Sequence, residues 1–339
     1  MKTAVLLNGN AKRVTPGLIR NFQELVPHQD LRVSRTMHEA RSIIEDLVDN
    51  GYQRVMSGGG DGTFVQVVND LVEVVNRRHA EGRPVQMPRV GILRLGTGNA
   101  VASFLGSSRP TRDLIRLRDG RVGAPIPLSL IESDGRRFPF AGFGYDGELL
   151  NDYIWFKRRV THPVLRPMLH SVGGYFAALG LRTIPRHVTG QGIRTPMRIT
   201  SLDSSWYSDP SREDHLIEQP PGTVLFEGIA TSACVGAVPY YGYAIKMFPF
   251  AGIHRGTFHL RVASMGVGTI LGNLGTIWRG TYRNPTQLFD YLCRRIRIEC
   301  EEPLPFQIGG DGAGYRNDLE FRVDPVTVPL VNMRMGIEA

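Results

Sequence analysis

The first part of the chain alternates short apolar runs with segments whose apolar residues recur at helical spacing. The apolar runs predict buried strands at Ala4–Leu7, Leu31–Val33, Arg54–Met56 and Val90–Leu95. Between them, the helical spacing predicts helices that include residues 40–47 and 64–75. Strands that alternate with helices are typical of a parallel sheet covered on both faces. Ligands of such sheets bind beyond the carboxyl ends of the strands, so we expect the loops there to carry the function.

After about residue 126 the pattern changes to short β-rich runs, which predict an antiparallel β-sandwich. These runs are Ile126–Ile131, Phe138–Phe143, Val224–Thr231, Thr257–Ala263, Arg295–Ile298, Leu319–Val323 and Val326–Val331. Two helical stretches interrupt them, at residues 149–181 and 267–279. Residues 190–222, rich in Pro, Gly, Ser and Asp, predict a hairpin with a long exposed loop.

The composition of the chain indicates that its partner is anionic. The chain has 339 residues, enough for about two domains. Its 40 Lys and Arg exceed its 32 Asp and Glu by 8, which favours a nucleic acid, a phosphorylated ligand or a membrane surface as partner. The cysteines, Cys234, Cys293 and Cys300, form no metal-binding pair and predict a reducing compartment. We expect neither a secretion signal nor a spanning helix.

The motif Ser57-Gly58-Gly59-Gly60-Asp61-Gly62-Thr63 follows a predicted strand and opens a predicted helix. Consecutive glycines let the backbone approach a bulky anion, and the N–H groups at a helix N-terminus point at phosphate oxygens. Asp61 would repel a phosphate directly, but it fits as a ligand of the magnesium that bridges phosphates. The alternative is a tight turn with an acidic first helical turn. We favour the phosphate site, because GGDGT would arise by chance in about one such chain in a thousand.

A second glycine-rich motif, Leu95-Gly96-Thr97-Gly98-Asn99, follows the next predicted strand and leads into a short helix. Taken alone, it is equally well explained as a loop with an Asn cap. In a parallel sheet, however, two such loops can face one cleft. The second motif therefore strengthens the interpretation of the first.

Together these motifs resemble the catalytic domain of diacylglycerol kinases and their relatives, the sphingosine, ceramide and other lipid kinases. The resemblance rests on GGDGT with the later Val68-Asn69-Asp70-Leu71, on LGTGN, on Gly142-Phe143-Gly144-Tyr145-Asp146 and on the position of Gln307–Gly312. It implies a nucleotide-binding α/β domain over residues 1–126 joined to an antiparallel β-sandwich domain over 127–324 that binds lipid. The last strand, at about 325–339, would return to the first domain. ATP and magnesium (Mg2+) would lie in the cleft between the domains.

The resemblance also assigns site residues. The nucleotide site would be lined by Asn8, Thr36, Gly58, Gly59, Gly60, Gly62, Thr63, Gly96, Thr97, Gly98 and Asn99. Asp61 would act in catalysis through the metal, and Asp146 would lie near the lipid headgroup. Two of these residues have a structural alternative. Thr36-Met37-His38-Glu39 is also a capping box, and Asp146 before Gly147 is also a turn aspartate.

The chain departs from the family at the catalytic base. The family's D-G-E motif ends in a glutamate thought to take the proton of the attacking hydroxyl, but here Asp311-Gly312 is followed by Ala313. Either Asp311 or a nearby carboxylate replaces that base, or the chain binds without efficient catalysis. We favour retained activity with Asp311 as base, because phosphoryl transfer depends mainly on positioning and charge stabilisation. A second, structural magnesium site is not expected, since His254-Arg255-Gly256 stands where bacterial relatives have D-D-G.

A lipid kinase needs apolar and basic side chains on one face beside its cleft. Residues 153–187 hold both kinds. They include Tyr153, Ile154, Trp155, Phe156, Lys157, Arg158, Arg159, Arg166, Tyr175, Phe176, Leu179, Leu181, Arg182 and Arg186. We therefore expect a cytoplasmic protein that associates peripherally with an anionic membrane surface. The alternative is a helix pair packed in the core with solvated charges. The aromatic segment 238–243 would either line a lipid pocket or pack the sandwich.

The function that we predict is ATP-dependent phosphorylation of a membrane lipid hydroxyl, in diacylglycerol or in a ceramide or sphingoid base. A kinase of a soluble dinucleotide or sugar phosphate is one alternative, because distant relatives share GGDGT. Dinucleotide kinases usually have an Asn-Glu pair where this chain has Asn99-Ala100. A nucleotide-dependent membrane-binding protein with weak catalysis is the other alternative. We expect no nucleic-acid partner, and the sequence is compatible with a homodimer.

Overall fold

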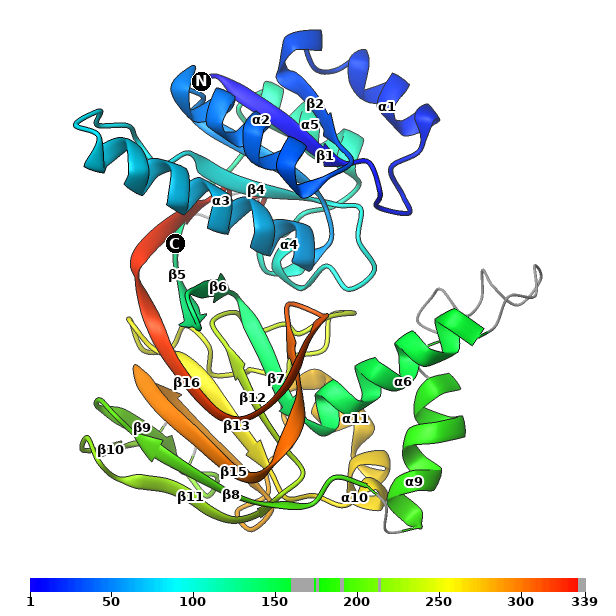
Figure 1. The fold of residues 1–339 in the computed structure, drawn as a ribbon, viewed down its shortest axis with the longest axis vertical. Helices are drawn as coiled ribbons and strands as arrows, with labels where there is room; N and C mark the ends of the chain where they lie inside the picture. Colours follow the sequence, from blue (N-terminus) through cyan, green and yellow to red (C-terminus); the bar gives the residue numbers. More distant parts are fainter. Residues whose placement is uncertain (160–173, 175–176, 190–191, 213–214, 335–339) are drawn as a thin grey trace. The chain divides into compact units, whose positions relative to one another are not determined.

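The structure is a computed structural model that describes residues 1–159, 174, 177–189, 192–212 and 215–334. It divides the chain into two compact units, which we describe separately (Figure 1). The first unit holds Met1–Leu130 and Asp324–Ala339, and the second holds Ile131–Val323. The first unit is therefore assembled from both ends of the chain.

A parallel sheet forms the centre of the first unit. Its strands are β1 (Thr3–Asn8), β2 (Leu31–Ser34), β3 (Arg54–Gly59) and β4 (Arg89–Arg94), in the order β4, β3, β1, β2. Each neighbouring pair is parallel. The end of β16 (Asp311–Leu330) continues the sheet beside β4, where Leu330 pairs with Val90. The predicted α/β sheet is confirmed.

Helices connect these strands and cover the sheet. They are α1 (Pro16–Gln23), α2 (Met37–Asp49), α3 (Asp61–Ala80), α4 (Ala100–Phe104) and α5 (Pro110–Arg118), with a 3-10 turn at His28–Asp30. The helices predicted around residues 40–47 and 64–75 lie within α2 and α3. Helices α1 and α5 were not predicted. Each begins with a proline, which fits the first turn of a helix because no N–H partner is needed there.

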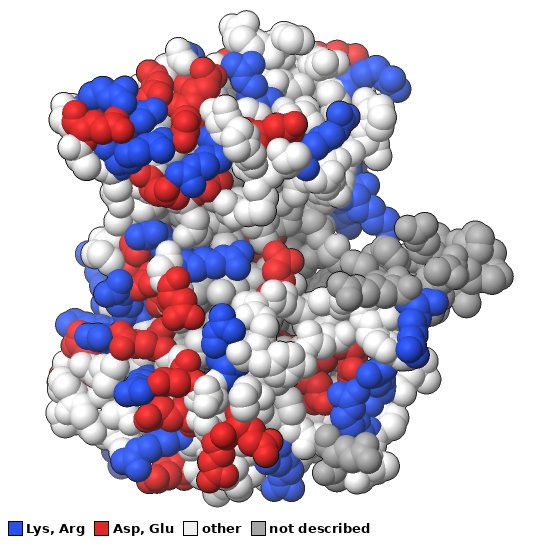
Figure 2. All heavy atoms as spheres, viewed as in Figure 1, with Lys and Arg blue, Asp and Glu red and all other residues white. Residues whose placement is uncertain are grey.

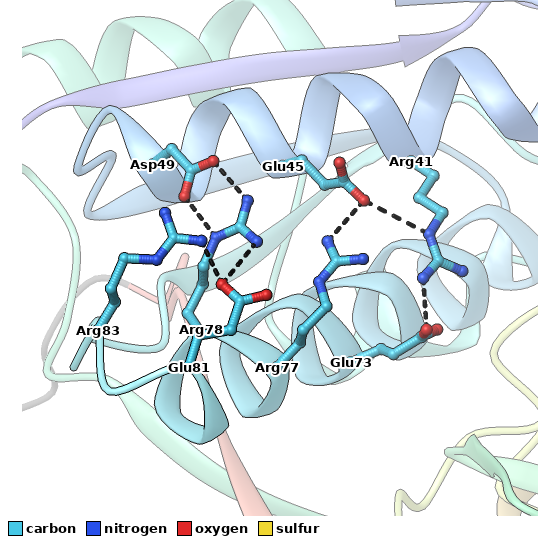
Figure 3. Close-up of polar contacts among 8 residues, drawn as sticks. All are labelled: Arg41, Glu45, Asp49, Glu73, Arg77, Arg78, Glu81 and Arg83. Atoms are coloured by element: carbon cyan, nitrogen blue, oxygen red, sulfur yellow. Dashed lines mark hydrogen bonds and ion pairs between the residues drawn. The ribbon is translucent and has the colours of Figure 1, made fainter.

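Charged side chains join α2 to α3 along their exposed faces (Figure 3). Arg78 donates two hydrogen bonds to Asp49, at 2.7 and 2.6 Å, and Arg77 donates one to Glu45 at 2.7 Å. In Figure 2, blue and red side chains alternate over these helices. Opposite charges that satisfy one another leave little net potential. This face of the first unit is therefore a structural contact rather than an anion site.

Antiparallel strands build the second unit. They are β6 (Arg136–Phe138), β7 (Phe140–Gly144), β8 (Thr195–Ser201), β9 (Ser205–Ser208), β10 (Leu216–Gln219), β11 (Val224–Ala230), β12 (Ser232–Gly236), β13 (Phe258–Ala263), β14 (Leu288–Cys293), β15 (Arg295–Ile308) and most of β16, with the end of β5 (Ile126–Ser133). One run of neighbours is β10-β9-β14-β13-β12-β7-β15, and β11 pairs with β8, which pairs with β15.

Strand β15 takes part in both layers of this unit. Its residues 296–300 pair with β8, and residues 306–308 pair with β7. Pro303 and Pro305 lie between the two parts, and a proline gives no N–H to a ladder, so the register shifts there. The layers pack face to face, because the rings of Phe226 on β11 and Phe289 on β14 lie 5.5 Å apart. The predicted antiparallel sandwich is confirmed.

The helices of the second unit are α6 (Tyr145–Arg159), α9 (Ile184–Val188), α10 (Val267–Gly272) and α11 (Leu274–Arg279), with a π-helical turn at Leu179–Thr183. The predicted stretch at 267–279 is helical but divides at Asn273. Of the stretch predicted at 149–181, residues 160–173 and 175–176, including Arg166, Tyr175 and Phe176, lie outside the described residues. Among the helices that are described, none is long and apolar enough to cross a bilayer.

Two local predictions were wrong. Residues 190–222 hold three strands, β8, β9 and β10, instead of one hairpin. The two strands predicted at Leu319–Val323 and Val326–Val331 are parts of one strand, β16. The sequence suggested a break at Asp324-Pro325. The Asp324 carboxylate instead accepts a hydrogen bond from the Val326 N–H at 2.7 Å, which supports the extended backbone beside the proline.

Candidate functional site

The first glycine-rich motif is the end of β3 and the start of α3. Every residue of β3 is buried, and Asp61 is the first residue of α3. The glycines are required by packing. A Cβ atom on Gly58 would lie 2.3 Å from the Leu7 side chain, and one on Gly59 would lie 2.3 Å from Thr63 Oγ1. The exposed edge of this turn is therefore backbone, which is the chemistry that a phosphate-binding loop needs.

The second glycine-rich motif meets the first backbone to backbone. A Cβ atom on Gly96 would lie 2.2 Å from the Cα atom of Gly60. Asn99 adopts a left-handed conformation, with φ of 54°, and holds the turn through its side chain. Its Oδ1 accepts from the Gly96 N–H at 3.1 Å, and its Nδ2 donates to the Gly96 carbonyl at 2.8 Å. The structure thus brings the two motifs, residues 57–63 and 95–99, into direct backbone contact. We call these two loops together the cradle.

Asp61 ties this cradle together. Its Oδ2 accepts a hydrogen bond from the Ala100 N–H and its Oδ1 accepts one from the Val101 N–H, both at 3.0 Å. These N–H groups belong to the first turn of α4, so the carboxylate caps that helix. Only 6% of Asp61 is exposed, and burial raises its pKa to about 6. Sequence reasoning missed this cap, and the magnesium role of Asp61 stays a prediction.

The other predicted residues, apart from Thr36, also lie at the two loops. Asn8, at the end of β1, donates through Nδ2 to Thr63 Oγ1 at 3.0 Å. Gly62 lies in the first turn of α3, and Thr97 and Gly98 complete the β4 loop. Thr36 is the N-cap of α2 and forms the complete capping box with Glu39. The structural alternative therefore accounts for Thr36, and its contact with a nucleotide stays a prediction.

The donor set fits a metal that arrives with a nucleotide. Among the described residues, no group of three or more His, Cys, Asp or Glu could hold a metal ion by itself. Magnesium bound to nucleotide phosphates needs only one or two carboxylates, the other ligands being phosphate oxygens and water. Asp61 is the buried carboxylate of this site, and backbone hydrogen bonds from Ala100, Val101, Asn99 and Asp61 itself oppose the rise of its pKa. Its part as a ligand of such an ion stays a prediction.

A half-buried carboxylate is the centre of the second unit's polar site. Asp146, in the first turn of α6, accepts hydrogen bonds through Oδ2 from the Tyr241 hydroxyl and from Gln307 Nε2, the latter at 2.9 Å. Burial raises its pKa to about 6. Gly142 packs against it, since a Cβ there would lie 1.7 Å from Oδ2. Asp146 is therefore no simple turn residue, and its tyrosine and glutamine partners were not predicted.

Asp311 lies at the turn between β15 and β16. It is exposed and is the first residue of β16, after Gly309 and Gly310, whose φ angles are 58° and 87°. Gln307 fixes this turn, because its Oε1 accepts the Gly310 N–H at 2.7 Å. One side chain thus links the Asp311 turn to Asp146. The exposed carboxylate has the accessibility that a general base requires, and its role stays a prediction.

Acidic partners neutralise two of the arginines predicted to face lipid. Arg182 pairs with the buried Asp152 at 2.7 Å, and Arg186 pairs with Asp152 at 3.1 Å and also with Glu148. His187 Nε2 lies 3.0 Å from the same Glu148. These two arginines therefore belong to a polar cluster inside α6 and α9, and they leave little net charge for a membrane.

Comparison with known proteins gives the chain its relatives. Residues 2–123 match the model of the diacylglycerol kinase catalytic domain. A probable lipid kinase YegS-like of Xanthomonas euvesicatoria is 30% identical over 105 residues, which are 31% of this chain and 32% of that protein. A diacylglycerol kinase of Bacillus subtilis is 20% identical over 300 residues, which are 88% of this chain and 84% of that one. The chain spans about a third of the length of the YegS-like relatives from Xanthomonas that it matches.

Solved structures extend the likeness of fold to both units. A putative diacylglycerol kinase from Bacillus anthracis superposes with a TM-score of 0.63 at 17% identity, covering 98% of this chain and 97% of that chain. A second structure from that organism, described as a putative diacylglycerol kinase, gives a TM-score of 0.64 at 16% identity. The resemblance to the diacylglycerol kinase catalytic domain family that the glycine-rich motifs predicted is thereby confirmed for residues 2–123.

Proposed function

We propose that the chain is an ATP-dependent lipid kinase that transfers the γ-phosphate to the hydroxyl of a diacylglycerol-type lipid. The observation that carries the proposal is the backbone contact between Gly60 and Gly96, which joins two phosphate-type loops into one rigid cradle. Phosphoryl transfer depends mainly on positioning and on electrostatic stabilisation, and a preformed cradle of N–H groups supplies both. The relatives named as lipid kinases support a lipid acceptor.

The nucleotide would lie on the first unit. Backbone N–H groups of the β3 and β4 loops would hold its phosphates, and Asn8 and Thr63 would fix the edge of the cradle through their mutual hydrogen bond. Asp61 would hold the magnesium ion, which when bound offsets phosphate charge. The carboxylate would keep its bonds to α4 at the same time, so that one side chain would serve structure and ligand binding.

The acceptor would lie on the second unit. Asp311 would take the proton of the acceptor hydroxyl while its oxygen forms the new bond to the γ-phosphorus, and the bond to the β-phosphate oxygen would break to release ADP. Asp146 would accept a hydrogen bond from a polar group of the lipid headgroup. Ceramide and sphingoid bases stay alternative acceptors, because their hydroxyls offer the same chemistry.

The test is transfer of radiolabelled γ-phosphate from ATP, with magnesium, to diacylglycerol, ceramide, sphingosine and monoacylglycerol in mixed micelles. We expect a labelled glycerolipid, and loss of at least about a hundredfold in rate for Asp311→Asn if this residue is the base. Asp134→Asn is the matched control, since Asp134 is exposed, has a φ of 50° that Asn also adopts, and lies in another turn of the second unit.

The outcomes separate the alternatives. If ATP binds but no lipid is labelled, the lipid-kinase proposal fails, and a soluble acceptor or a binding protein becomes the better hypothesis. If Asp311→Asn turns over at the wild-type rate while a lipid is labelled, the proposal stands but the base is another group.

A further inference from the structure

Residues 228–289 contain no Asp or Glu. With 32 acidic residues in 339, a segment of this length would hold about six at the average spacing. Five Lys and Arg remain, where the average spacing would give about seven: Lys246, Arg255, Arg261, Arg279 and Arg283. Of these, Arg261 is buried and pairs with Asp290 at 2.7 Å. The rest of the segment is apolar, glycine-rich and cationic, so its surface repels cations and attracts anions.

The helix pair α10–α11 lies within this segment and buries none of its residues. Its apolar side chains, Val267, Ile270, Leu271, Leu274, Ile277 and Trp278, are therefore all partly or largely accessible, and Leu271 is 42% exposed. A soluble helix normally buries such a stripe against a core. Here Ile270 packs on the buried Ala263, Met265 and Leu288, but the stripe as a whole is only half-buried and Leu271 is exposed.

The glycines of this helix pair serve no close packing. A Cβ atom on Gly266, Gly268, Gly272 or Gly275 would meet nothing within 4 Å. Glycine lowers helix stability, and no collision explains these four, in contrast to Gly58 and Gly96, where a Cβ would collide. These glycines, which have no neighbour within 4 Å of a Cβ position, instead leave the helix backbone accessible at the surface. The boundary between a membrane and water can accommodate such a surface.

Cations and a further exposed leucine lie beside the pair. Helix α10 contacts α9, and the two lie close together in Figure 1. Leu181, in the turn before α9, is 71% exposed. The Lys246 N–H donates to the Trp278 carbonyl at 2.9 Å, which places this lysine at the end of α11 beside Arg279. Both cations are exposed. We call Val267–Arg279 with Leu181 and Lys246 the α10–α11 face.

We propose that the α10–α11 face docks on a bilayer surface that carries anionic phospholipid. Apolar side chains would enter the boundary between headgroups and acyl chains, and Lys246 and Arg279 would meet the anionic headgroups. The absence of carboxylates from the segment removes repulsion from that surface. The inference rests on the proposed function for its purpose, because docking would bring the enzyme to a lipid substrate. The binding itself is independent of catalysis.

The test is co-sedimentation of the full chain with vesicles of phosphatidylcholine, with and without phosphatidylglycerol. We expect binding that needs phosphatidylglycerol and weakens as salt rises. Leu271→Asp should weaken it by at least about tenfold, because a carboxylate enters the apolar stripe. Arg279→Gln, which changes no apolar contact, should weaken binding by about fivefold, the effect of one basic residue near an anionic surface.

The chain offers matched controls for both variants. Ile217 on β10 is 39% exposed, close to the 42% of Leu271, but it lies beside Glu218 in a segment with several acids. Arg212 is an exposed arginine of a surface turn. Ile217→Asp and Arg212→Gln should bind vesicles as the wild type does. If they weaken binding as much as Leu271→Asp and Arg279→Gln do, the effect is one of overall charge and the docking face is wrong.

Failure of docking and failure of the proposed function give different results. Phosphorylation of dioctanoylglycerol, assayed as a dissolved monomer, reports catalysis without a bilayer. Leu271→Asp should keep that rate while losing activity on long-chain diacylglycerol in vesicles. Vesicle binding without phosphorylation of either lipid would support the face and overturn the function. Equal vesicle binding by wild type and Leu271→Asp, or a dimer in light scattering that this variant abolishes, would overturn the face.

Discussion

Gly96 shows how a single hydrogen in place of a side chain shapes the site. Its Cα lies against Gly60, and a Cβ would come within 2.2 Å of that Cα atom and 2.9 Å of the Gly60 nitrogen. Backbone cannot swing aside as a flexible side chain can, so the two loops would have to separate. The motif LGTGN therefore has a packing requirement at its first glycine that is independent of any nucleotide.

We predict that Gly96→Ala lowers the free energy of unfolding by about 1 to 3 kcal/mol and weakens ATP binding strongly, because the cradle opens. Urea unfolding and isothermal titration with ATP and magnesium would measure both. Gly17→Ala is the matched control in the first unit, since a Cβ there meets only Thr15 Oγ1 at 3.9 Å. Wild-type ATP affinity in Gly96→Ala would contradict the role of the loop contact.

Asp146 makes stability depend on pH. Burial raises its pKa from 3.8 to about 6. Between these values the unfolded chain holds fewer protons than the folded one, so the stability that the protonated Asp146 contributes falls as the pH rises. We expect the free energy of unfolding of the wild type, relative to Asp146→Asn, to fall by about 2 kcal/mol between about pH 4.5 and 6.5. Urea titrations across that range would measure it, and parallel profiles would refute it.

Among the elements, α2 and α3 show which charged pairs contribute to stability. Arg78 is 8% exposed and bonds both oxygens of Asp49, whereas Arg41 and Glu73 have side chains that are 38% and 57% exposed. Solvent screens the second pair far more than the first. The ion pairs in Figure 3 therefore differ in how much they stabilise the first unit, although they look alike in the picture.

We predict that Arg78→Ala destabilises the first unit more than Arg41→Ala does, because only the Arg78 pair is bidentate and shielded from solvent. A double-mutant cycle with Asp49→Ala would isolate the Arg78 pair in urea unfolding. A coupling energy near zero would show that Arg78 acts through packing of its stem alone.

The β15–β16 hairpin depends on one amide. Gln307 bonds Asp146 on one side and the Gly310 N–H on the other. We predict that Gln307→Leu lowers the free energy of unfolding by about 1 to 3 kcal/mol, because the buried Gln307 amide makes both bonds and its replacement leaves both partners without them. Hydrogen exchange at Gly310 should become faster, and Gln219→Leu at the exposed-edge strand β10 should leave it unchanged. Unaltered exchange at Gly310 would show that the turn is held by other contacts.

Sequence patterns predicted the parts of the fold in which neighbours in the chain act together. The glycine motifs, the strands before them and α2 and α3 follow from local spacing, and the sheet follows from their alternation. The cap of α4 by Asp61 was missed because its partners, Ala100 and Val101, lie about forty positions along the chain. Tyr241 was predicted only as part of an aromatic segment that lines a lipid pocket or packs the sandwich, since nothing local points it at Asp146. Strand β16 was predicted as two strands, one on each side of Asp324-Pro325.

At the scale of the whole molecule, the two ends of the chain share one core. Val331 and Met333 pack with Val5, Leu7 and Met56 in the core of the first unit. The Val331 N–H donates to the Val90 carbonyl at 2.9 Å. The region that matches the family model, residues 2–123, therefore lacks strand and core residues that its unit uses.

We predict that a fragment of residues 1–130 is unstable and aggregates, because β4 loses its neighbouring strand and the core loses Val331 and Met333. Joining residues 324–334 to it through a flexible linker should restore a cooperative unfolding transition. Circular dichroism melts of the two fragments would compare them. A stable fragment 1–130 would show that the C-terminal residues contribute little to the stability of the first unit.

The shared core also sets an order of events during synthesis. A ribosome that has made the first hundred residues has made both glycine-rich loops, yet β4 must wait for a strand more than two hundred residues away. The emerging first unit therefore has an open sheet edge for most of translation, the form in which chaperones bind and aggregation begins. The second unit is contained in one continuous stretch up to Val323 and needs no strand from beyond it. Completion of the first unit therefore requires β16 to have been made, so that chains truncated before β16 would not acquire a finished first unit.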